Sequence, residues 1–191
     1  NAVGMAIAEE IHRKKFGSSF INNKTYVIAS DGDLMEGVSH EAMSLAGHLK
    51  LKNLIIFFDN NKISIDGSTS LSVSDNYKKR FESYNWEFLE IDGHNEKQIS
   101  KAISRASKSN KPTIISCKTV IGFGSPNKSG KSSSHGSPLG EEEIALVRKK
   151  LKWNNKPFEI QQEILDEWKK IGDKGELLEK KWQEVINKKD P

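Results

Sequence analysis

The sequence has a single cysteine and no long hydrophobic run. Because Cys117 has no partner for an internal disulfide, the chain is typical of a reducing compartment, and we expect a cytoplasmic protein. No apolar stretch approaches the length of a membrane-spanning helix, and no basic–apolar–small pattern marks a signal peptide. The sequence therefore predicts no membrane partner.

Strong charge asymmetry is also absent. The 30 lysines and arginines are offset by 26 acidic residues, which leaves a net charge of +4. Lysines are spread through the chain among glutamates, as on a solvated surface, and no basic stripe is interleaved with aromatics, so we expect no nucleic-acid partner. The length of 191 residues accommodates one large domain, or one domain with an appendage.

Short apolar runs alternate with patterns of helical spacing along most of the chain. Strands are expected at 26–29, 54–58, 86–91 and 113–118, and helices at 1–16, 38–49, 77–84 and 99–106. The run of five apolar residues at 54–58 is typical of a strand covered on both faces. This alternation predicts an α/β fold with a doubly wound, mostly parallel sheet.

The last part of the chain has a different pattern. Three glutamates at 141–143 open a helix, where the helix dipole favours negative charge. Amphipathic helices are expected at 160–171 and 178–186, separated by Gly172-Asp173. We predict one α/β domain over 1–152 and a helical connector over 153–191. The chain begins inside an apparent helix without an initiator Met, so we interpret it as a piece of a longer protein.

Residues 122–140 are rich in Gly, Ser, Lys and Pro. By composition alone, this stretch is typical of a flexible linker. A phosphate-binding P-loop is the sharper alternative, but Gly124 and Gly130 are separated by five residues, where that motif requires four. The spacing therefore excludes a P-loop.

Polar residues follow the first two predicted strands. Asp31-Gly32 ends the first strand, and Asp59-Asn60-Asn61 ends the second. Since the carboxyl ends of parallel strands share one sheet edge, Asp31 and Asn61 should be neighbours in space. A carboxylate, an amide oxygen and a nearby carbonyl suit Mg²⁺ or Ca²⁺, and Gly32 would let a phosphate approach the backbone.

The thirty positions from Asp31-Gly32 to Asn61 resemble the thiamine-diphosphate-binding motif. The longer strings D-L-M-E-G-V-S-H-E-A, S-L-A-G-H-L-K-L, I-S-I-D-G, C-K-T-V-I-G-F-G-S-P-N-K and S-H-G-S-P-L-G resemble the transketolase family. One position departs from the family pattern, because Ser30 stands where Gly is usual. If this position requires a positive φ, Ser30 would add strain.

The resemblance implies a set of site residues. Asp31, Asn61 and the carbonyl of Ile63 would bind Mg²⁺, with Ca²⁺ or Mn²⁺ as substitutes. Gly32 would lie near the diphosphate, and Ile65 would border the thiazolium ring. Without the resemblance, Asp31 and Asn61 are ordinary turn residues, and Ile65 is ordinary core.

The resemblance also gives roles to Glu36 and His135. Glu36 would lie at a subunit interface, although by pattern alone it is a charge on a helix surface. His135 would contact the diphosphate and the sugar and assist proton transfer, a role that suits an imidazole. The remaining acidic and imidazole side chains of note are taken as structural or solvated: His12, His40, Glu41, His48 and His94.

The implied function is transketolase activity in the pentose phosphate pathway, with a two-carbon ketol unit moving from a ketose phosphate to an aldose phosphate. Thiamine diphosphate would carry the chemistry, in a homodimer whose second subunit supplies the glutamate that activates the cofactor. The isolated chain would bind the cofactor weakly and turn over nothing.

Two alternatives stay open. The first is another thiamine-diphosphate enzyme, such as dihydroxyacetone synthase; the string D-L-M-E-G-V-S-H-E-A argues against 1-deoxyxylulose-5-phosphate synthase. The second is a non-catalytic interaction domain of the same fold, for which Ser30 is the support.

Overall fold

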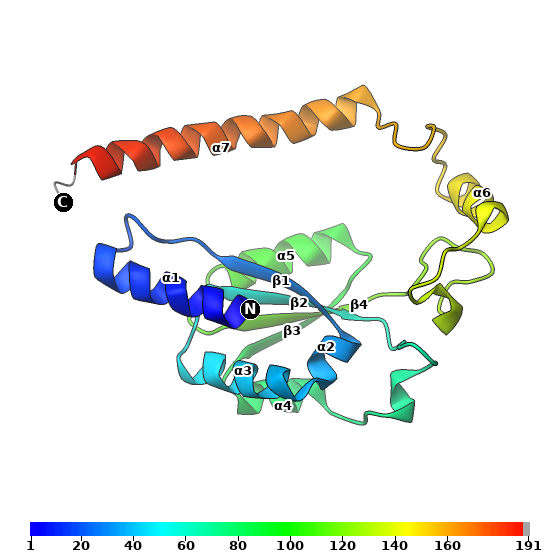
Figure 1. Cartoon of the computed structure of the whole chain (residues 1–191), viewed down its shortest axis with the longest axis horizontal. Helices are drawn as coiled ribbons and strands as arrows, with labels where there is room; N and C mark the ends of the chain where they lie inside the picture. Colours follow the sequence, from blue (N-terminus) through cyan, green and yellow to red (C-terminus); the bar gives the residue numbers. More distant parts are fainter. Residues whose placement is uncertain (189–191) are drawn as a thin grey trace.

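A four-stranded parallel sheet forms the centre of the computed structural model, which describes residues 1–188 (Figure 1). The strands are β1 (Thr25–Ser30), β2 (Leu54–Asn60), β3 (Glu87–Asp92) and β4 (Thr113–Lys118). Their order across the sheet is β1-β2-β4-β3, and each pairing is parallel. All four predicted strands are thus confirmed.

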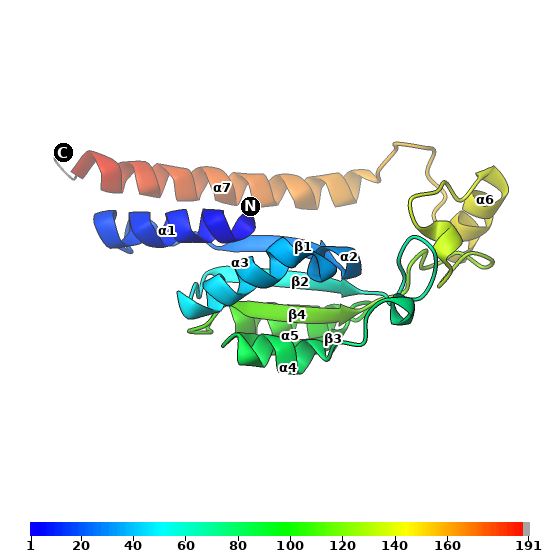
Figure 2. The same ribbon diagram turned by 60° about the horizontal axis from the view of Figure 1, so that its bottom comes forward.

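Helices cover both faces of this sheet. The helices are α1 (Ala2–Phe16), α2 (Asp31–Met35), α3 (Gly37–His48), α4 (Tyr77–Ser83), α5 (Glu96–Ala106), α6 (Glu141–Lys150) and α7 (Gln162–Lys188), with short 3₁₀ turns at Thr69–Leu71 and Ser132–Ser134. Helices α3 and α4 lie on one face and α5 lies on the other (Figure 2). This arrangement confirms the predicted α/β fold with a doubly wound sheet and a C-terminal helical extension.

Side chains of β2 alternate between two cores. Ile56 and Phe58 pack with α1, α3 and α4, whereas Ile55 packs with Ala102 and Ala106 of α5. Helix α5 contacts β3 but does not extend over β1, where Ile28 is 82% exposed. One half of the second sheet face is therefore open.

The C-terminal extension differs from the prediction of two helices. Helix α7 continues through Gly172 for 27 residues. The helix contains two glycines, Gly172 and Gly175, each of which costs a helix only about 1 kcal/mol. Ion pairs such as Glu176–Lys180 lie along α7. Figures 1 and 2 show α7 alongside α1, and the indole N–H of Trp182 donates to the carbonyl of Phe20 at 3.1 Å. Within residues 1–188, no helix is long and apolar enough to cross a membrane.

Two local predictions were wrong. The helical spacing of Val38, Ala42, Leu45, Ala46 and Leu49 predicts one apolar face. Val38, Leu45 and Leu49 are exposed, however, and the buried residues of α3 are Met43, Ala46 and Gly47. The Ser-rich stretch at 67–75 predicts a loop with a helix cap at Ser74 or Asp75. The cap of α4 is instead Asn76, whose Oδ1 accepts from the backbone N–H of Lys79 at 2.9 Å. Capping geometry depends on the entry angle of the chain, which composition does not determine.

The Gly- and Ser-rich stretch at 122–140 is held in place and does not behave as a free linker. Glu143 of α6 accepts hydrogen bonds from the Ser125 hydroxyl and from the Asn127 backbone and side-chain N–H groups, the last two at 2.8 and 2.9 Å. These bonds lower the pKa of Glu143 to about 2, the bond from Ser125 contributing most. A carboxylate in α6 therefore fixes the turn that follows β4.

Candidate functional site

The carboxyl ends of β1 and β2 bring the two predicted polar turns together. Ser30 pairs with Asp59 in the register of the two strands, so Asp31 follows β1 at the edge where Asn61 follows β2. A simple turn was predicted at Asp31, but in the structure Asp31 begins α2. The structure therefore places Asp31 and Asn61 at the same sheet edge.

Asp31 has an unusual environment. Its side chain is 2% exposed, and neither carboxylate oxygen has a hydrogen-bond partner among the described residues. Burial raises its pKa; the nearby backbone N–H groups of Lys62 and Asn61 lower it in part, although neither makes a hydrogen bond of normal geometry. Buried carboxylates are normally paired or bound to metal. The arrangement therefore fits a cation in contact with Asp31.

Asn61 is held by its own loop. Its Oδ1 accepts from the backbone N–H of Ile63 at 2.9 Å, and its Nδ2 donates to Asp59 at 3.3 Å. The second carboxylate oxygen of Asp59 accepts from the Thr119 hydroxyl. An amide oxygen has two lone pairs, so Oδ1 keeps one acceptor position. This loop can present an oxygen ligand without rearranging its hydrogen bonds.

Ser30, the residue that departs from the family pattern, causes no strain. Its φ of −103° and ψ of 177° are ordinary extended values. Its backbone N–H and its hydroxyl both donate to Asp33 Oδ2, at 2.7 and 2.8 Å. A methyl group at Gly32 would meet nothing within 4 Å, so the fold itself does not require glycine there. The turn tolerates Ser30, and any need for Gly32 would come from a ligand.

Three other predicted site residues are exposed. Ile65 is 74% exposed, Glu36 is exposed at the junction of α2 and α3, and His135 is exposed after the second 3₁₀ turn. A Cβ at Gly122 would lie 2.9 Å from the Ser134 hydroxyl, so the segment before His135 packs on the turn after β4. His135 is therefore close in sequence to a segment at the sheet edge.

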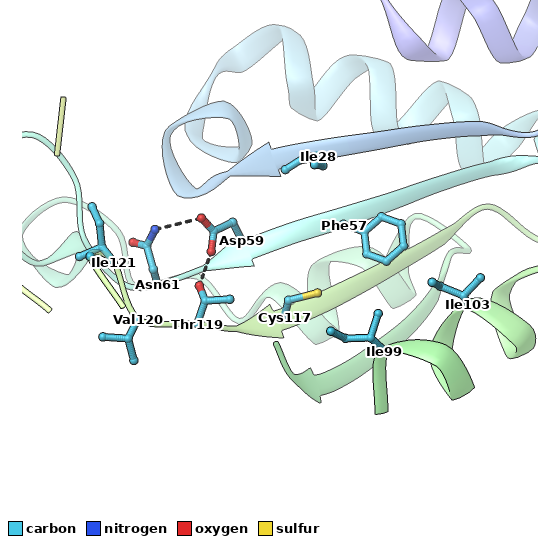
Figure 3. Close-up of a pocket in the computed structure, with 11 residues that line it drawn as sticks. Ile28, Phe57, Asp59, Asn61, Ile99, Ile103, Cys117, Thr119, Val120 and Ile121 are labelled. Carbon is cyan, nitrogen blue, oxygen red and sulfur yellow. Dashed lines mark hydrogen bonds between the residues drawn. The ribbon is translucent and has the colours of Figure 1, made fainter. Parts of the chain in front are cut away.

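A cavity of about 630 Å³ extends from this edge over the open half of the sheet (Figure 3). Asp59, Asn61 and Thr119 form its polar end. Its apolar part is lined by Ile28, Phe57, Ile99, Ile103, Cys117, Val120, Ile121 and Gly122. Ile63, Ile65 and His135 do not line it. Sequence reasoning missed Asp59 and Thr119, although both follow strand patterns that end at this edge.

Tyr77 was also missed. Its hydroxyl is buried without a hydrogen-bond partner, as is the side-chain oxygen of Asn60. Burial and then the nearby Asp31 carboxylate raise the pKa of Tyr77. The sequence gave no signal that the Tyr77 hydroxyl lies near Asp31, because the helical pattern assigns Tyr77 to the core.

Metal binding at this edge would depend on few protein groups. The described residues contain no cluster of three or more His, Cys, Asp or Glu side chains able to hold a metal ion. One carboxylate and one amide satisfy only part of the octahedral shell of Mg²⁺. A ligand with phosphate oxygens would complete that shell.

Comparisons with known proteins identify the family. A family model, described as the thiamine diphosphate binding domain of transketolase, matches residues 1–190. A transketolase from Buchnera aphidicola is 54% identical over 192 residues, with 98% of this chain and 29% of the relative covered. Transketolase 2 of Escherichia coli is 51% identical over 189 residues, covering 96% and 28%.

Solved structures give the same result. A transketolase from Campylobacter jejuni superposes with a TM-score of 0.96 at 41% identity, over 98% of this chain and 30% of that one. A transketolase from Pichia stipitis gives 0.93 at 38% identity, over 98% and 29%. The chain spans less than a third of the length of these relatives. Thiamine diphosphate is the cofactor of the matched domain, and the chain belongs to the transketolase family.

Proposed function

We propose that this chain supplies the metal and diphosphate half of a transketolase active site. The observation that carries the proposal is the buried, unpartnered carboxylate of Asp31 at the sheet edge shared with Asn61. An uncompensated buried carboxylate is costly, and a divalent cation would compensate it. Mg²⁺ is the proposed ion, with Ca²⁺ or Mn²⁺ as substitutes.

The proposed ligands are Asp31, the amide oxygen of Asn61 and the backbone carbonyl of Ile63. The diphosphate oxygens of the cofactor complete the coordination. Gly32 lies beside the diphosphate in this proposal, and its open surroundings support a close backbone approach. Ile65, an exposed apolar side chain, borders the thiazolium ring.

The proposed reaction moves a two-carbon ketol unit from a ketose phosphate to an aldose phosphate, as in the pentose phosphate pathway. Thiamine diphosphate supplies the carbanion chemistry when bound. The similar Pichia stipitis structure is a complex with sedoheptulose-7-phosphate, which supports sugar phosphates as substrates. His135 would contact the diphosphate and the sugar, and its imidazole would assist proton transfer.

We further propose that the complete protein is a cytoplasmic homodimer. Glu36, which is exposed here, lies at the subunit interface, and a second subunit contributes the glutamate that activates the cofactor. Residues 1–152 form the diphosphate-binding domain, and 153–191 connect it to a pyrimidine-binding domain; positions 189–191 lie outside the described residues. Because the activating glutamate is on another domain, the isolated chain is expected to be inactive.

Titration of the chain with thiamine diphosphate tests the proposal. Calorimetry should detect binding with Mg²⁺ and none with EDTA. Asp31→Ala should abolish the Mg²⁺-dependent heat, whereas Glu41→Ala, which removes an exposed carboxylate of α3, should leave it unchanged. Gly32→Ala should keep the cofactor-free fold but weaken binding. Equal binding by the wild-type chain and Asp31→Ala would refute the proposal.

The alternatives have less support. Ser30 was the reason to consider a non-catalytic interaction domain, but its ordinary backbone angles and its bonds to Asp33 remove that reason. Dihydroxyacetone synthase shares the proposed metal site. A ketol-transfer assay of the complete protein with formaldehyde and with ribose 5-phosphate as acceptors would separate these two activities.

A further inference from the structure

The turn between β3 and α5 supports one wall of the cavity. The backbone N–H of Val120 donates to Nε2 of His94 at 3.1 Å. Val120 belongs to the segment 119–122 that lines the cavity (Figure 3). His94 is not one of the lining residues, but it holds one of them by this bond.

A ring stack adds a second contact. The rings of His94 and Phe123 are 4.0 Å apart between centroids and inclined by 21°. Phe123 ends a turn in which its backbone N–H donates to the carbonyl of Val120 at 3.1 Å. His94 thus holds both ends of this turn, one by a hydrogen bond and one by stacking.

The turn that carries His94 is itself fixed. The backbone N–H of Gly93 donates to the carbonyl of Lys118 at 2.8 Å, and a Cβ on Gly93 would lie 2.5 Å from the Thr119 side chain. The backbone N–H of His94 donates to Asp92 Oδ1 at 2.9 Å. His94 is therefore presented from a rigid support, which a positioning role requires.

The direction of the bond to Val120 determines the tautomer. A backbone N–H can only donate, so Nε2 of His94 must carry a lone pair. The ring is then neutral, with its proton on Nδ1.

We propose that His94 is a positioning residue for the cavity whose polar end includes Asn61, a proposed metal ligand. As the neutral Nδ1–H tautomer it holds the Val120–Phe123 turn in the conformation that lines the cavity. The consequence for cofactor binding rests on the proposed function above. The tautomer of His94 and the restraint on Val120 are independent of the proposed function, because both are measured on the cofactor-free chain.

Nitrogen NMR of the ¹⁵N-labelled chain at neutral pH tests the tautomer. Nε2 of His94 should resonate as an unprotonated ring nitrogen and Nδ1 as a protonated one. An Nε2–H tautomer for His94 would overturn the proposal.

Amide hydrogen exchange tests the restraint. His94→Phe keeps an aromatic ring but removes the acceptor, so exchange of the Val120 amide should become about two- to ten-fold faster. His94→Gln places an amide oxygen near the position of Nε2 and should restore most of the protection. Exchange at Ile115, a buried residue of β4, should not change in either variant, which shows that the fold is intact.

The matched control is His48→Phe, which replaces an exposed histidine at the end of α3. It should leave Val120 exchange unchanged. Affinity for thiamine diphosphate with Mg²⁺ should fall several-fold in His94→Phe and recover in His94→Gln. Unchanged Val120 exchange in His94→Phe would overturn the restraint. Faster exchange with unchanged cofactor affinity would overturn the link to the site while leaving the proposed function intact.

Discussion

Removing the charge of Asp31 should stabilise the metal-free chain. The carboxylate is 2% exposed and lacks hydrogen-bond partners, so the folded state carries an unsatisfied buried group. Such a group costs about 1–3 kcal/mol. A negative charge in the first turn of α2 stabilises the folded state by about 0.3–1 kcal/mol through the helix dipole, which offsets part of this cost. Asp31→Asn conserves volume and removes the charge, but its amide would also be unpartnered, so it should raise the free energy of unfolding by up to about 2 kcal/mol.

For a chain of this size, the gain corresponds to a Tm increase of up to about 8 °C. The assay is thermal unfolding with EDTA, as a difference between variant and wild type. Because burial raises the pKa of Asp31 in the fold, its destabilising effect is absent below its ordinary pKa of about 4 and develops as the pH rises through the folded-state pKa. The stability difference should therefore grow with pH.

Asp33→Ala is the matched control in the same turn. Asp33 accepts two hydrogen bonds from Ser30, so its loss should destabilise the chain by about 0.5–2 kcal/mol, the opposite sign. If Asp31→Asn is less stable than the wild type in EDTA at neutral pH, the carboxylate is satisfied without a cation. The argument for a metal site would then fail.

Three further predictions concern the fold around the site. Glu143→Gln should remove a stability contribution that the wild type keeps above pH about 4.5 and loses as the pH falls toward the folded-state pKa of about 2; acid unfolding followed by circular dichroism measures it. Ile56→Ala should cost about 2–5 kcal/mol in urea unfolding because Ile56 is 3% exposed, whereas Ile28→Ala should stay within about 0.5 kcal/mol; similar losses would contradict the open sheet face. Gly47→Ala should destabilise the chain by about 1–3 kcal/mol in thermal unfolding, since its Cβ would lie 1.7 Å from the Tyr84 carbonyl oxygen. Gly37→Ala should be nearly neutral in the same assay, because its Cβ would meet nothing within 4 Å.

The sheet was the most predictable part of the fold. The run Leu54–Phe58 is apolar on both strand faces, and the structure buries Leu54, Ile55, Ile56 and Phe58. Such runs are typical of parallel strands covered by helices, so the local pattern and the tertiary structure agree. The same pattern predicts that the polar residues at the carboxyl ends of the strands lie together at one edge of the sheet.

The helices were less predictable at their ends. Gly172 was interpreted as a break, but α7 continues through it, because two glycines, Gly172 and Gly175, do not outweigh the rest of a 27-residue helix. Asp31-Gly32 was interpreted as a turn, although the hydrogen bonds between Ser30 and Asp33 start a helix there. In both cases the residue type favours a break or a turn, but the neighbouring residues stabilise a helix instead.

The site was predictable only in part. The proximity of Asp31 and Asn61 follows from topology, so spacing in the sequence was sufficient. The unpartnered hydroxyl of Tyr77 and the bond from Thr119 to Asp59 arise from contacts between distant segments, which no local pattern encodes. The roles of Ile63, Ile65, Glu36 and His135 remain proposals.

Anomalous diffraction from crystals grown with Mn²⁺ and thiamine diphosphate tests the central claim most directly. The account predicts a manganese peak within bonding distance of an Asp31 carboxylate oxygen and of the Asn61 amide oxygen, with diphosphate oxygens on the same ion. Bound cofactor with its metal elsewhere, and with Asp31 still unpartnered, would contradict it.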